Sequence, residues 1–225
     1  MTEKTLDSFG QHSRPPRLLS VVHLVEHPIV QDIVLQLRDA RTTPERFRQL
    51  AGRVSVFLAA EALRDLPTVE ASVETPLGTA RGRRANTDVV LVPVLRAGLG
   101  MLPGMLELVP DARVGHIGLQ RDERTAAASQ YYAKLPPRLE SSYVLMIDPM
   151  LATGGSAVAA LEMLARAGAR NIRLVCIVAA PEGIAAVEKV YPKVPIFTPV
   201  VDERLNDHKF IVPGLGDFGD RLYGT

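Results

Sequence analysis

The clearest structural pattern in the chain is Y-V-L-M-I-D-P-M-L-A-T-G-G-S-A-V-A-A-L-E-M-L-A-R-A-G, residues 143–168. It opens with the apolar run 143–147, breaks at Asp148-Pro149, and passes through the small residues 153–156. From Val158 onward, apolar residues recur at the spacing of a helix. The stretch therefore predicts a strand, a loop and a helix in that order, which is the repeating unit of an α/β fold.

The loop between this strand and this helix has the chemistry of a phosphate site. Gly154 and Gly155 let the backbone approach a ligand closely, and the hydroxyls of Thr153 and Ser156 add donors. The helix that follows points its unpaired N–H groups toward the same place. Asp148 stands at the carboxyl end of the strand, where a carboxylate can accept hydrogen bonds from two neighbouring ribose hydroxyls. We therefore expect the loop to hold a phosphorylated sugar.

Other loop motifs fit these residues poorly. A Walker loop requires a lysine after its last glycine, and none follows Gly155. The nucleophile elbow G-x-S-x-G is missing because Ser156 follows two adjacent glycines and precedes Ala157-Val158. A plain strand-to-helix turn that uses glycines for tightness is the alternative that the residues leave open.

Length and composition favour one α/β domain in a reducing compartment. The chain has 225 residues, of which 47% are hydrophobic, enough for a substantial core. Its net charge of +1 gives no general attraction to nucleic acid or to an anionic membrane. The single cysteine, Cys176, lies in an apolar run and is expected in the core. Because no segment has the pattern of a signal peptide or a membrane span, we expect a cytoplasmic protein.

Strands and helices alternate along most of the chain. Strands are expected at residues 21–25, 89–95, 114–119, 143–147, 172–180 and 194–201. Helices are expected to begin at Pro28 and at Pro44, the second capped by Thr43. Residues 1–20 predict a flexible N-terminal arm, and Pro76-Leu77-Gly78 predicts the turn of a peripheral hairpin. Residues 21–225 thus predict a single domain with a mostly parallel sheet and helices on both faces.

A second glycine loop, R-A-G-L-G at residues 96–100, follows the buried strand 89–95. A dinucleotide fingerprint needs a third spaced glycine, whereas Pro103 and Gly104 follow here. Arg96 offers a better account, because its planar and permanently charged fork suits diphosphate oxygens. An arginine that is simply solvated at a strand end is the alternative.

Two later segments have the features of a ligand cover and of a base site. Residues 120–142 are charged and unpatterned at their centre, which predicts a flexible hood over a site. Residues 202–225 form a glycine-rich terminal loop that exposes backbone N–H and C=O groups. Such groups can read a planar base that carries an imide and a carbonyl, without a charged side chain. A glycine-rich tail without a ligand remains the alternative.

Three segments resemble one known family, in the family's own order. The central loop resembles the phosphoribosyl-diphosphate loop of uracil phosphoribosyltransferases, a type I phosphoribosyltransferase family, through the run V-L-M-I-D-P-M-L-A-T-G-G-S. Two other runs resemble the diphosphate-contacting and uracil-binding segments of that family: V-P-V-L-R-A-G-L-G-M and I-V-P-G-L-G-D-F-G-D-R. The resemblance covers residues 21–225. It implies transfer of the 5-phosphoribosyl group from phosphoribosyl diphosphate to uracil, giving UMP and diphosphate in pyrimidine salvage.

The resemblance also implies roles for individual residues. Catalytic roles fall to Asp148, Arg121 and Asp217. Phosphoribosyl diphosphate would be bound by Arg96, Arg121, Asp148, Pro149, Met150, Leu151, Ala152, Thr153, Gly154, Gly155, Ser156 and Asp217. Uracil would be bound by Ile211, Gly216, Asp217 and Phe218. No dedicated metal site is expected, so Mg²⁺ would arrive bound to the diphosphate. The family further implies a homodimer or higher homo-oligomer, with GTP as a candidate activator.

The sequence departs from the family pattern at several of these places. Phe218 stands where alanine is usual, and Arg204 and Lys209 stand where glycine is usual. The hood lacks the prolines that normally separate its threonine from its tyrosine pair, and carries A-A-A-S-Q at residues 126–130. An aromatic ring at position 218 either narrows the base pocket or stacks on its ligand. Two alternatives therefore stay open: a phosphoribosyltransferase for another base, and a non-catalytic nucleotide-sensing or RNA-binding regulator.

Overall fold

The computed structural model describes residues 21–121 and 128–225. The expected N-terminal arm, residues 1–20, and the centre of the expected hood, residues 122–127, lie outside the described residues. Arg121 ends a strand, but its side chain also lies outside the description. None of the helices in the two described ranges has the length and apolarity needed to cross a bilayer.

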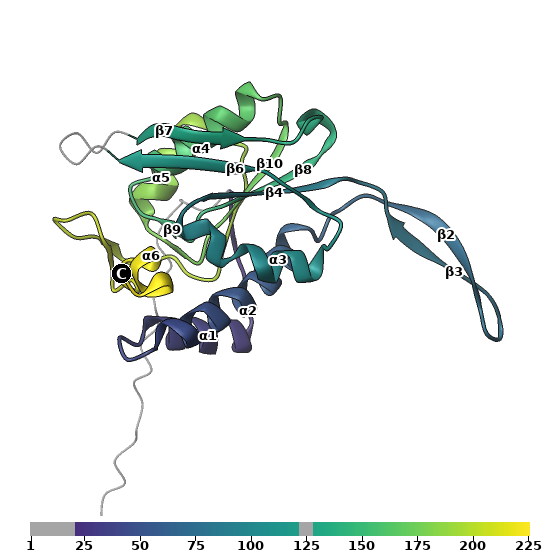
Figure 1. The fold of residues 1–225 in the computed structure, drawn as a ribbon, viewed down its shortest axis with the longest axis horizontal. Coiled ribbons are helices and arrows are strands. Elements are labelled where there is room, and N and C mark those ends of the chain that lie inside the picture. The colour runs from purple at the N-terminus through teal and green to yellow at the C-terminus, as the bar shows by residue number, and fades with distance from the viewer. Residues whose placement is uncertain (1–20, 122–127) are drawn as a thin grey trace, which may run out of the picture.

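A mostly parallel sheet forms the centre of the molecule (Figure 1). Its strands lie in the spatial order β1, β12, β10, β8, β4, β6 and β7, with β5 paired to β4. They span Val22–Leu24, Ile196–Thr198, Asn171–Val175, Tyr143–Ile147, Val89–Leu95, His116–Arg121, Ala128–Lys134 and Arg113–Val114, respectively. Only the pair formed by β6 and β7 is antiparallel within this sheet. The expected α/β fold with a mostly parallel sheet is therefore confirmed.

The helices begin where the sequence places their start signals. In α1 (Pro28–Arg38), the His27 side chain caps the first turn by accepting a hydrogen bond from the Ile29 amide at 3.1 Å. In α2 (Pro44–Ala62), Thr43 Oγ1 accepts from the Arg46 amide at 3.3 Å. In both helices a proline occupies the first turn, where its missing N–H costs no hydrogen bond. The remaining helices are α3 (Leu102–Leu108), α4 (Gly155–Arg166), α5 (Pro181–Val190) and α6 (Phe218–Tyr223), with the 3₁₀ turns η1 (Ala97–Gly100) and η2 (Leu139–Ser141).

Two hydrophobic clusters cover the two faces of the sheet. Along β4, Val89 and Leu91 belong to the cluster that contains α1, α2, α3 and α6. The intervening Val90, Val92 and Val94 belong to the cluster formed with α4 and α5. This alternation is what a strand buried on both faces requires. Helices consequently lie on both faces of the sheet, as Figure 1 shows.

A two-stranded hairpin projects from the body of the protein (Figure 1). It consists of β2 (Thr68–Thr75) and β3 (Gly78–Ala85), joined at the predicted turn. Its residues are nearly all exposed, and Leu77 at the tip is fully exposed. The peripheral hairpin expected from the sequence is thus confirmed.

Two expected strands are shorter than their apolar runs. The run 172–180 divides into β10, ending at Val175, and β11 (Val178–Ala179), which pairs with β9 (Met150–Leu151). The division occurs because the amides of Ile177 and Val178 both donate to the carbonyl of Pro149, at 2.9 and 3.1 Å. Within the expected strand 194–201, only β12 (Ile196–Thr198) forms. Pro195 and Pro199 flank it, and a proline has no N–H to donate to the hydrogen bonds of a sheet.

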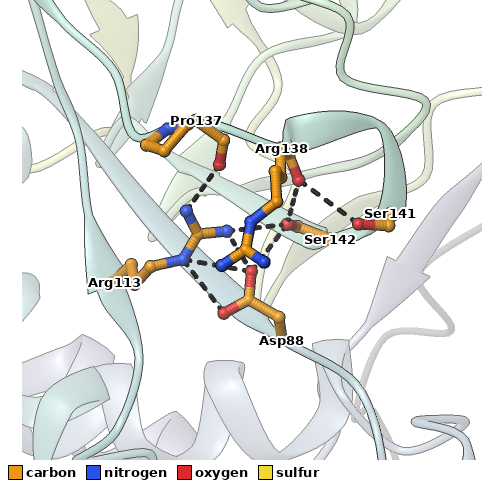
Figure 2. A network of polar contacts seen from close by, with 6 residues as sticks. All are labelled: Asp88, Arg113, Pro137, Arg138, Ser141 and Ser142. Carbon is orange, nitrogen blue, oxygen red and sulfur yellow. Dashed lines mark hydrogen bonds and ion pairs between the residues drawn. The ribbon is translucent and has the colours of Figure 1, made fainter.

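A polar network secures the amino ends of the central strands (Figure 2). Asp88 precedes β4, Arg113 lies in β5 and Ser142 precedes β8. Arg113 Nε donates to Asp88 Oδ1 at 3.0 Å, while Arg113 Nη1 donates to the carbonyl of Pro137 at 2.5 Å. Ser142 Oγ lies 2.7 Å from Asp88 Oδ2. The network ties the segment after β7 to the strand ends farthest from Asp148.

Candidate active site

Three segments that are far apart in the sequence meet at the carboxyl edge of the sheet. β4 and β8 are parallel neighbours with Pro93 opposite Ile147, so the residues that follow them, Arg96 and Asp148, lie at the same edge. A cavity of about 320 Å³ opens there. It is lined by Val94, Leu95, Arg96, Ala97, Leu119, Asp148, Met150, Ala152, Ser156, His208, Lys209, Phe210, Ile211, Gly216, Asp217, Phe218 and Gly219.

The predicted phosphate loop forms one wall of this cavity. Gly154 adopts φ 80°, and α4 begins at the next residue. A Cβ at position 154 would lie 2.7 Å from Cβ of Ala186 and 2.9 Å from the carbonyl oxygen of Gly183. Glycine is therefore required both by conformation and by space. The amide of Gly155, the first residue of α4, donates to Thr153 Oγ1 at 3.5 Å, and the N-terminus of the helix favours an anion at this point.

The residues expected to bind phosphoribosyl diphosphate divide into two groups in this loop. Asp148, Met150, Ala152 and Ser156 line the cavity. The other five lie in the same loop without lining the cavity: Pro149, Leu151, Thr153, Gly154 and Gly155. The backbone of the second group supports the loop, since the carbonyls of Pro149 and Leu151 accept hydrogen bonds from the neighbouring segment 177–180.

Arg96 lies at the opposite wall, directly after β4. Its side chain is exposed, and its guanidinium carbon lies 5.9 Å from the ring centre of Tyr223. The hydroxyl of Tyr223 donates to the Arg96 carbonyl at 3.3 Å. The following Gly98 packs so tightly that a Cβ there would lie 2.5 Å from the carbonyl oxygen of Ile147. This close approach of η1 to the end of β8 brings Arg96 to the same cavity as Asp148.

The glycine-rich C-terminal segment closes the third side. Ile211, Gly216, Asp217 and Phe218 line the cavity, as the resemblance implied for the uracil site. Gly216 adopts φ 82°, which turns the chain away from the buried core. Asp217 is exposed, and its Oδ1 caps α6 by accepting from the Asp220 amide at 2.9 Å. Its carboxylate thus stands at the boundary between the cavity and a helix N-terminus.

The ring of Phe218 packs into the protein core. The residue is 2% exposed, and its ring meets that of Phe47 edge-on with centroids 5.0 Å apart. The ring also approaches η1, because a Cβ at Gly100 would lie 3.2 Å from its Cε1. An aromatic side chain at position 218 is therefore accommodated between α2 and α6.

The sequence did not reveal that a hairpin tip would also line the cavity. β13 (Arg204–Leu205) and β14 (Ile211–Val212) pair and place His208, Lys209 and Phe210 at the cavity wall. Asn206 shapes this tip, since its Oδ1 accepts from the amides of His208 and Phe210 at 3.0 and 2.9 Å. Lys209 has φ 65°, a conformation that favours glycine. The glycine usual in the family at that position was the available signal.

Cys176 directly follows β10, is fully buried and does not line the cavity. Complete burial raises the pKa of its thiol to about 12. A hydrogen bond with Thr198 lowers this pKa, and the charge of Asp148 raises it further. The thiol therefore stays protonated at neutral pH, which confirms the expectation of a small core residue.

Comparisons with known proteins agree with this geometry. The model of the family described as uracil phosphoribosyltransferase matches residues 24–225. The chain belongs to the uracil phosphoribosyltransferase family. The uracil phosphoribosyltransferase of Dictyoglomus turgidum is 52% identical over 206 residues, which cover 91% of this chain and 100% of the relative. That of Symbiobacterium thermophilum is 50% identical over 92% of this chain and 100% of its own length.

A solved structure supports the fold of this family member. The AQ2163 protein from Aquifex aeolicus superposes with a TM-score of 0.86 at 40% sequence identity. The superposition covers 91% of this chain and 98% of the Aquifex chain. The overall fold of this chain is thus shared with that solved structure.

Proposed function

We propose that this uracil phosphoribosyltransferase family member transfers the 5-phosphoribosyl group of phosphoribosyl diphosphate to N1 of uracil, giving UMP and diphosphate. The observation that carries the proposal is the meeting of three separate segments at one cavity. The phosphate loop supplies Ser156 and Asp148, the end of β4 supplies Arg96, and the C-terminal segment supplies Gly216 and Asp217. A phosphate, a sugar, a diphosphate and a base each find complementary chemistry there.

The two ends of the phosphoribosyl group match the two ends of the phosphate loop. The 5-phosphate would sit at the N-terminus of α4, where Thr153 and Ser156 flank the two glycines in sequence and would add their hydroxyls to the backbone N–H groups. The ribose hydroxyls would donate to Asp148, which stands at the carboxyl end of β8. This arrangement fixes the sugar at both ends and so orients its anomeric carbon.

Positively charged arginine side chains would stabilise the departing diphosphate. Breaking the anomeric bond leaves positive charge on the ribose and negative charge on the diphosphate. Arg96 at the cavity wall would bind the diphosphate, joined by Arg121 from the expected hood at residues 120–142. Asp217 would face the ribose and the diphosphate from the opposite side. Catalysis would then rest on orientation and electrostatic stabilisation.

Backbone groups would read the base. Uracil presents an imide N–H and two carbonyls, and backbone groups of the cavity-lining residues Ile211, Gly216 and Phe218 would form hydrogen bonds with them. No charged side chain is needed for such recognition. Because the ring of Phe218 packs against Phe47, the substitution at this position is compatible with a pyrimidine in the cavity.

The donor set fits a magnesium ion carried by the substrate. Within the described ranges, no group of three or more histidine, cysteine or acidic side chains is placed to hold a metal. Asp148 and Asp217 do line the cavity, and Mg²⁺ commonly binds one or two carboxylates together with substrate phosphates and water. When bound, the ion would neutralise diphosphate charge. On family grounds we also propose a homodimer or higher homo-oligomer and GTP as an activator.

The proposed reaction is tested by UMP formation in purified wild-type protein and in Asp148→Asn. Asparagine preserves the size of the side chain but removes the charge and one acceptor for the ribose hydroxyls. We expect the rate with uracil to fall by about 100-fold. Asp88→Asn, at the far end of the same strands, should retain the wild-type rate. Equal rates in wild type and Asp148→Asn would contradict the proposed role of the loop.

A further inference from the structure

A largely buried ion pair, Arg38 with Asp202, supports the C-terminal segment that lines the cavity. Asp202 precedes β13 and its side chain is 4% exposed, while Arg38 ends α1 and is 20% exposed. Arg38 donates from both terminal nitrogens to the two carboxylate oxygens, at 2.6 and 2.8 Å. Paired forks of this kind fix direction as well as distance. The pair joins parts of the chain that lie 164 residues apart.

Both residues of this pair also form hydrogen bonds with the backbone of Gly214. The Gly214 amide donates to Asp202 Oδ2 at 2.8 Å, and the Gly214 carbonyl accepts from Arg38 Nη1 at 2.7 Å. Gly214 is buried and has φ 59°, and a Cβ there would overlap the Ile211 carbonyl. Arg38, Asp202 and Gly214 therefore form a closed three-membered hydrogen-bonded unit, which we call the Gly214 clamp.

A second arginine holds the next residue. Arg221 Nη1 donates to the Leu215 carbonyl at 2.8 Å and also to the Leu37 carbonyl. Its Nη2 donates to the Asp39 carbonyl at 2.6 Å. The C-terminal end of α1 is thus bound to the segment on both sides of the Gly214–Leu215 peptide.

The clamp lies where the chain passes from the protein core to the wall of the cavity. Gly214 and Leu215 are buried, and neither lines the cavity. The next two residues, Gly216 and Asp217, are exposed and do line it. Because the clamp fixes the backbone just before Gly216, it determines where the backbone groups of that residue point.

We propose that Arg38 and Asp202 are positioning residues for the base. They line no part of the cavity and would act through Gly214, by holding Gly216 and its neighbours in the geometry that reads uracil. The inference rests on the proposed function of the cavity. Small misplacement of a binding group is costly for recognition, so loosening the clamp should weaken uracil binding selectively.

Two substitutions test the clamp. Arg38→Lys keeps the charge but loses the planar guanidinium. Its two terminal nitrogens donate in the wild type to both carboxylate oxygens of Asp202 and to the carbonyl of Gly214, and a single ammonium group cannot reproduce this geometry. Asp202→Asn keeps the shape but replaces one carboxylate oxygen with an NH₂ group, which cannot accept a hydrogen bond from Arg38 or from the Gly214 amide. In each variant we expect the KM for uracil to rise by about 10-fold, with the KM for phosphoribosyl diphosphate within twofold of wild type.

A matched control exists in the middle of β10, beside the C-terminal end of α2. Arg173 in β10 is also buried, at 7% exposed, and also pairs through two nitrogens with an aspartate, Asp65, at 2.5 and 3.1 Å. It donates in addition to the carbonyl of Ala62. Arg173→Lys therefore removes the same kind of fork far from the C-terminal segment. It should lower the melting temperature while leaving both KM values within twofold of wild type.

A second readout does not require turnover. Amide hydrogen exchange in residues 211–217 should be at least about 10-fold faster in Arg38→Lys than in wild type, and unchanged in Arg173→Lys. Unchanged uracil KM in folded clamp variants would overturn the inference, as would equal rises in both KM values or unchanged exchange. If Asp202→Asn does not fold, Arg38→Lys decides the question. A wild-type protein that makes no UMP would refute the proposed function, whereas an active wild type with unaffected clamp variants would refute only the clamp.

Discussion

Phe218 illustrates how one residue can line a site and serve the core at the same time. It lines the cavity where we propose that uracil binds, but its ring packs between α2 and α6 against Phe47. From sequence alone the ring could be placed only in the base pocket, because no local pattern connects positions 47 and 218. The aromatic pair is a tertiary contact, which is why the sequence did not predict it.

Phe218→Ala should therefore cost stability and leave base binding nearly intact. Loss of a buried phenylalanine ring typically lowers the free energy of unfolding by about 3–5 kcal/mol. Urea unfolding measures this loss, and steady-state kinetics should give a uracil KM within about threefold of wild type. Phe47→Ala is the matched control, and the double variant should show a coupling of about 1 kcal/mol. A large change in uracil KM at wild-type stability would instead place the ring in the base site.

Among the elements, α4 has one glycine with a left-handed backbone conformation before its start and another after its end. Gly154 at its start has φ 80° and is crowded by Ala186 and Gly183, whereas Gly168 after its end has φ 91° and open space around its Cβ position. The two glycines share a backbone conformation and differ in their surroundings. They therefore allow conformational cost and crowding to be separated.

Gly168→Ala should destabilise the protein by only the cost of a left-handed alanine, about 1–2 kcal/mol. Gly154→Ala adds a steric clash, so it should destabilise the protein further and raise the KM for phosphoribosyl diphosphate by about 10-fold or more. Thermal unfolding and kinetics of both variants test this difference. Similar KM values for the two variants would show that the loop tolerates displacement.

The Asp88 network in Figure 2 gives the scaffold a dependence on acid. Hydrogen bonding from Arg113 lowers the pKa of the Asp88 carboxyl, and Ser142 lowers it further. The folded-state pKa thus lies below the unfolded value, so the stabilisation is fully present above about pH 4 and is lost as pH falls through the folded-state pKa. Asp88→Asn should lower the melting temperature by about 3 °C at pH 7, and the difference should shrink at pH 3. A constant difference between pH 7 and pH 3 would contradict this assignment.

Sequence reasoning succeeded where local chemistry decides structure. The helix starts at Pro28 and Pro44, the cap at Thr43, the strand–loop–helix order of residues 143–168 and the peripheral hairpin all follow from neighbouring residues. The sequence did not predict features that depend on contacts between distant segments. One example is the break in the expected strand 172–180, where the amides of Ile177 and Val178 donate to the carbonyl of Pro149. The Gly214 clamp could not be predicted for the same reason, because Arg38 in α1 and Asp202 before β13 are far apart in the sequence and share no local pattern.

At the scale of the whole molecule, a parallel sheet brings three loops together at one edge. β4 and β8 end beside each other, which brings Arg96 and Asp148 to one cavity, and residues of the C-terminal segment line the same cavity. The sequence placed two of these elements correctly, since strand ends in parallel sheets share an edge. The cover provided by His208 and Lys209 required the structure, because it depends on how the β13–β14 hairpin lies over the cavity.

The central claim is that this cavity joins phosphoribosyl diphosphate to uracil. The most direct measurement is product formation by the purified protein with Mg²⁺, phosphoribosyl diphosphate and, in separate reactions, uracil, hypoxanthine, xanthine, guanine or adenine. We predict UMP from uracil alone, with diphosphate released in equal amount. Turnover of a different base would contradict the assignment of base specificity, and binding of phosphoribosyl diphosphate without any product would contradict the enzymatic role itself.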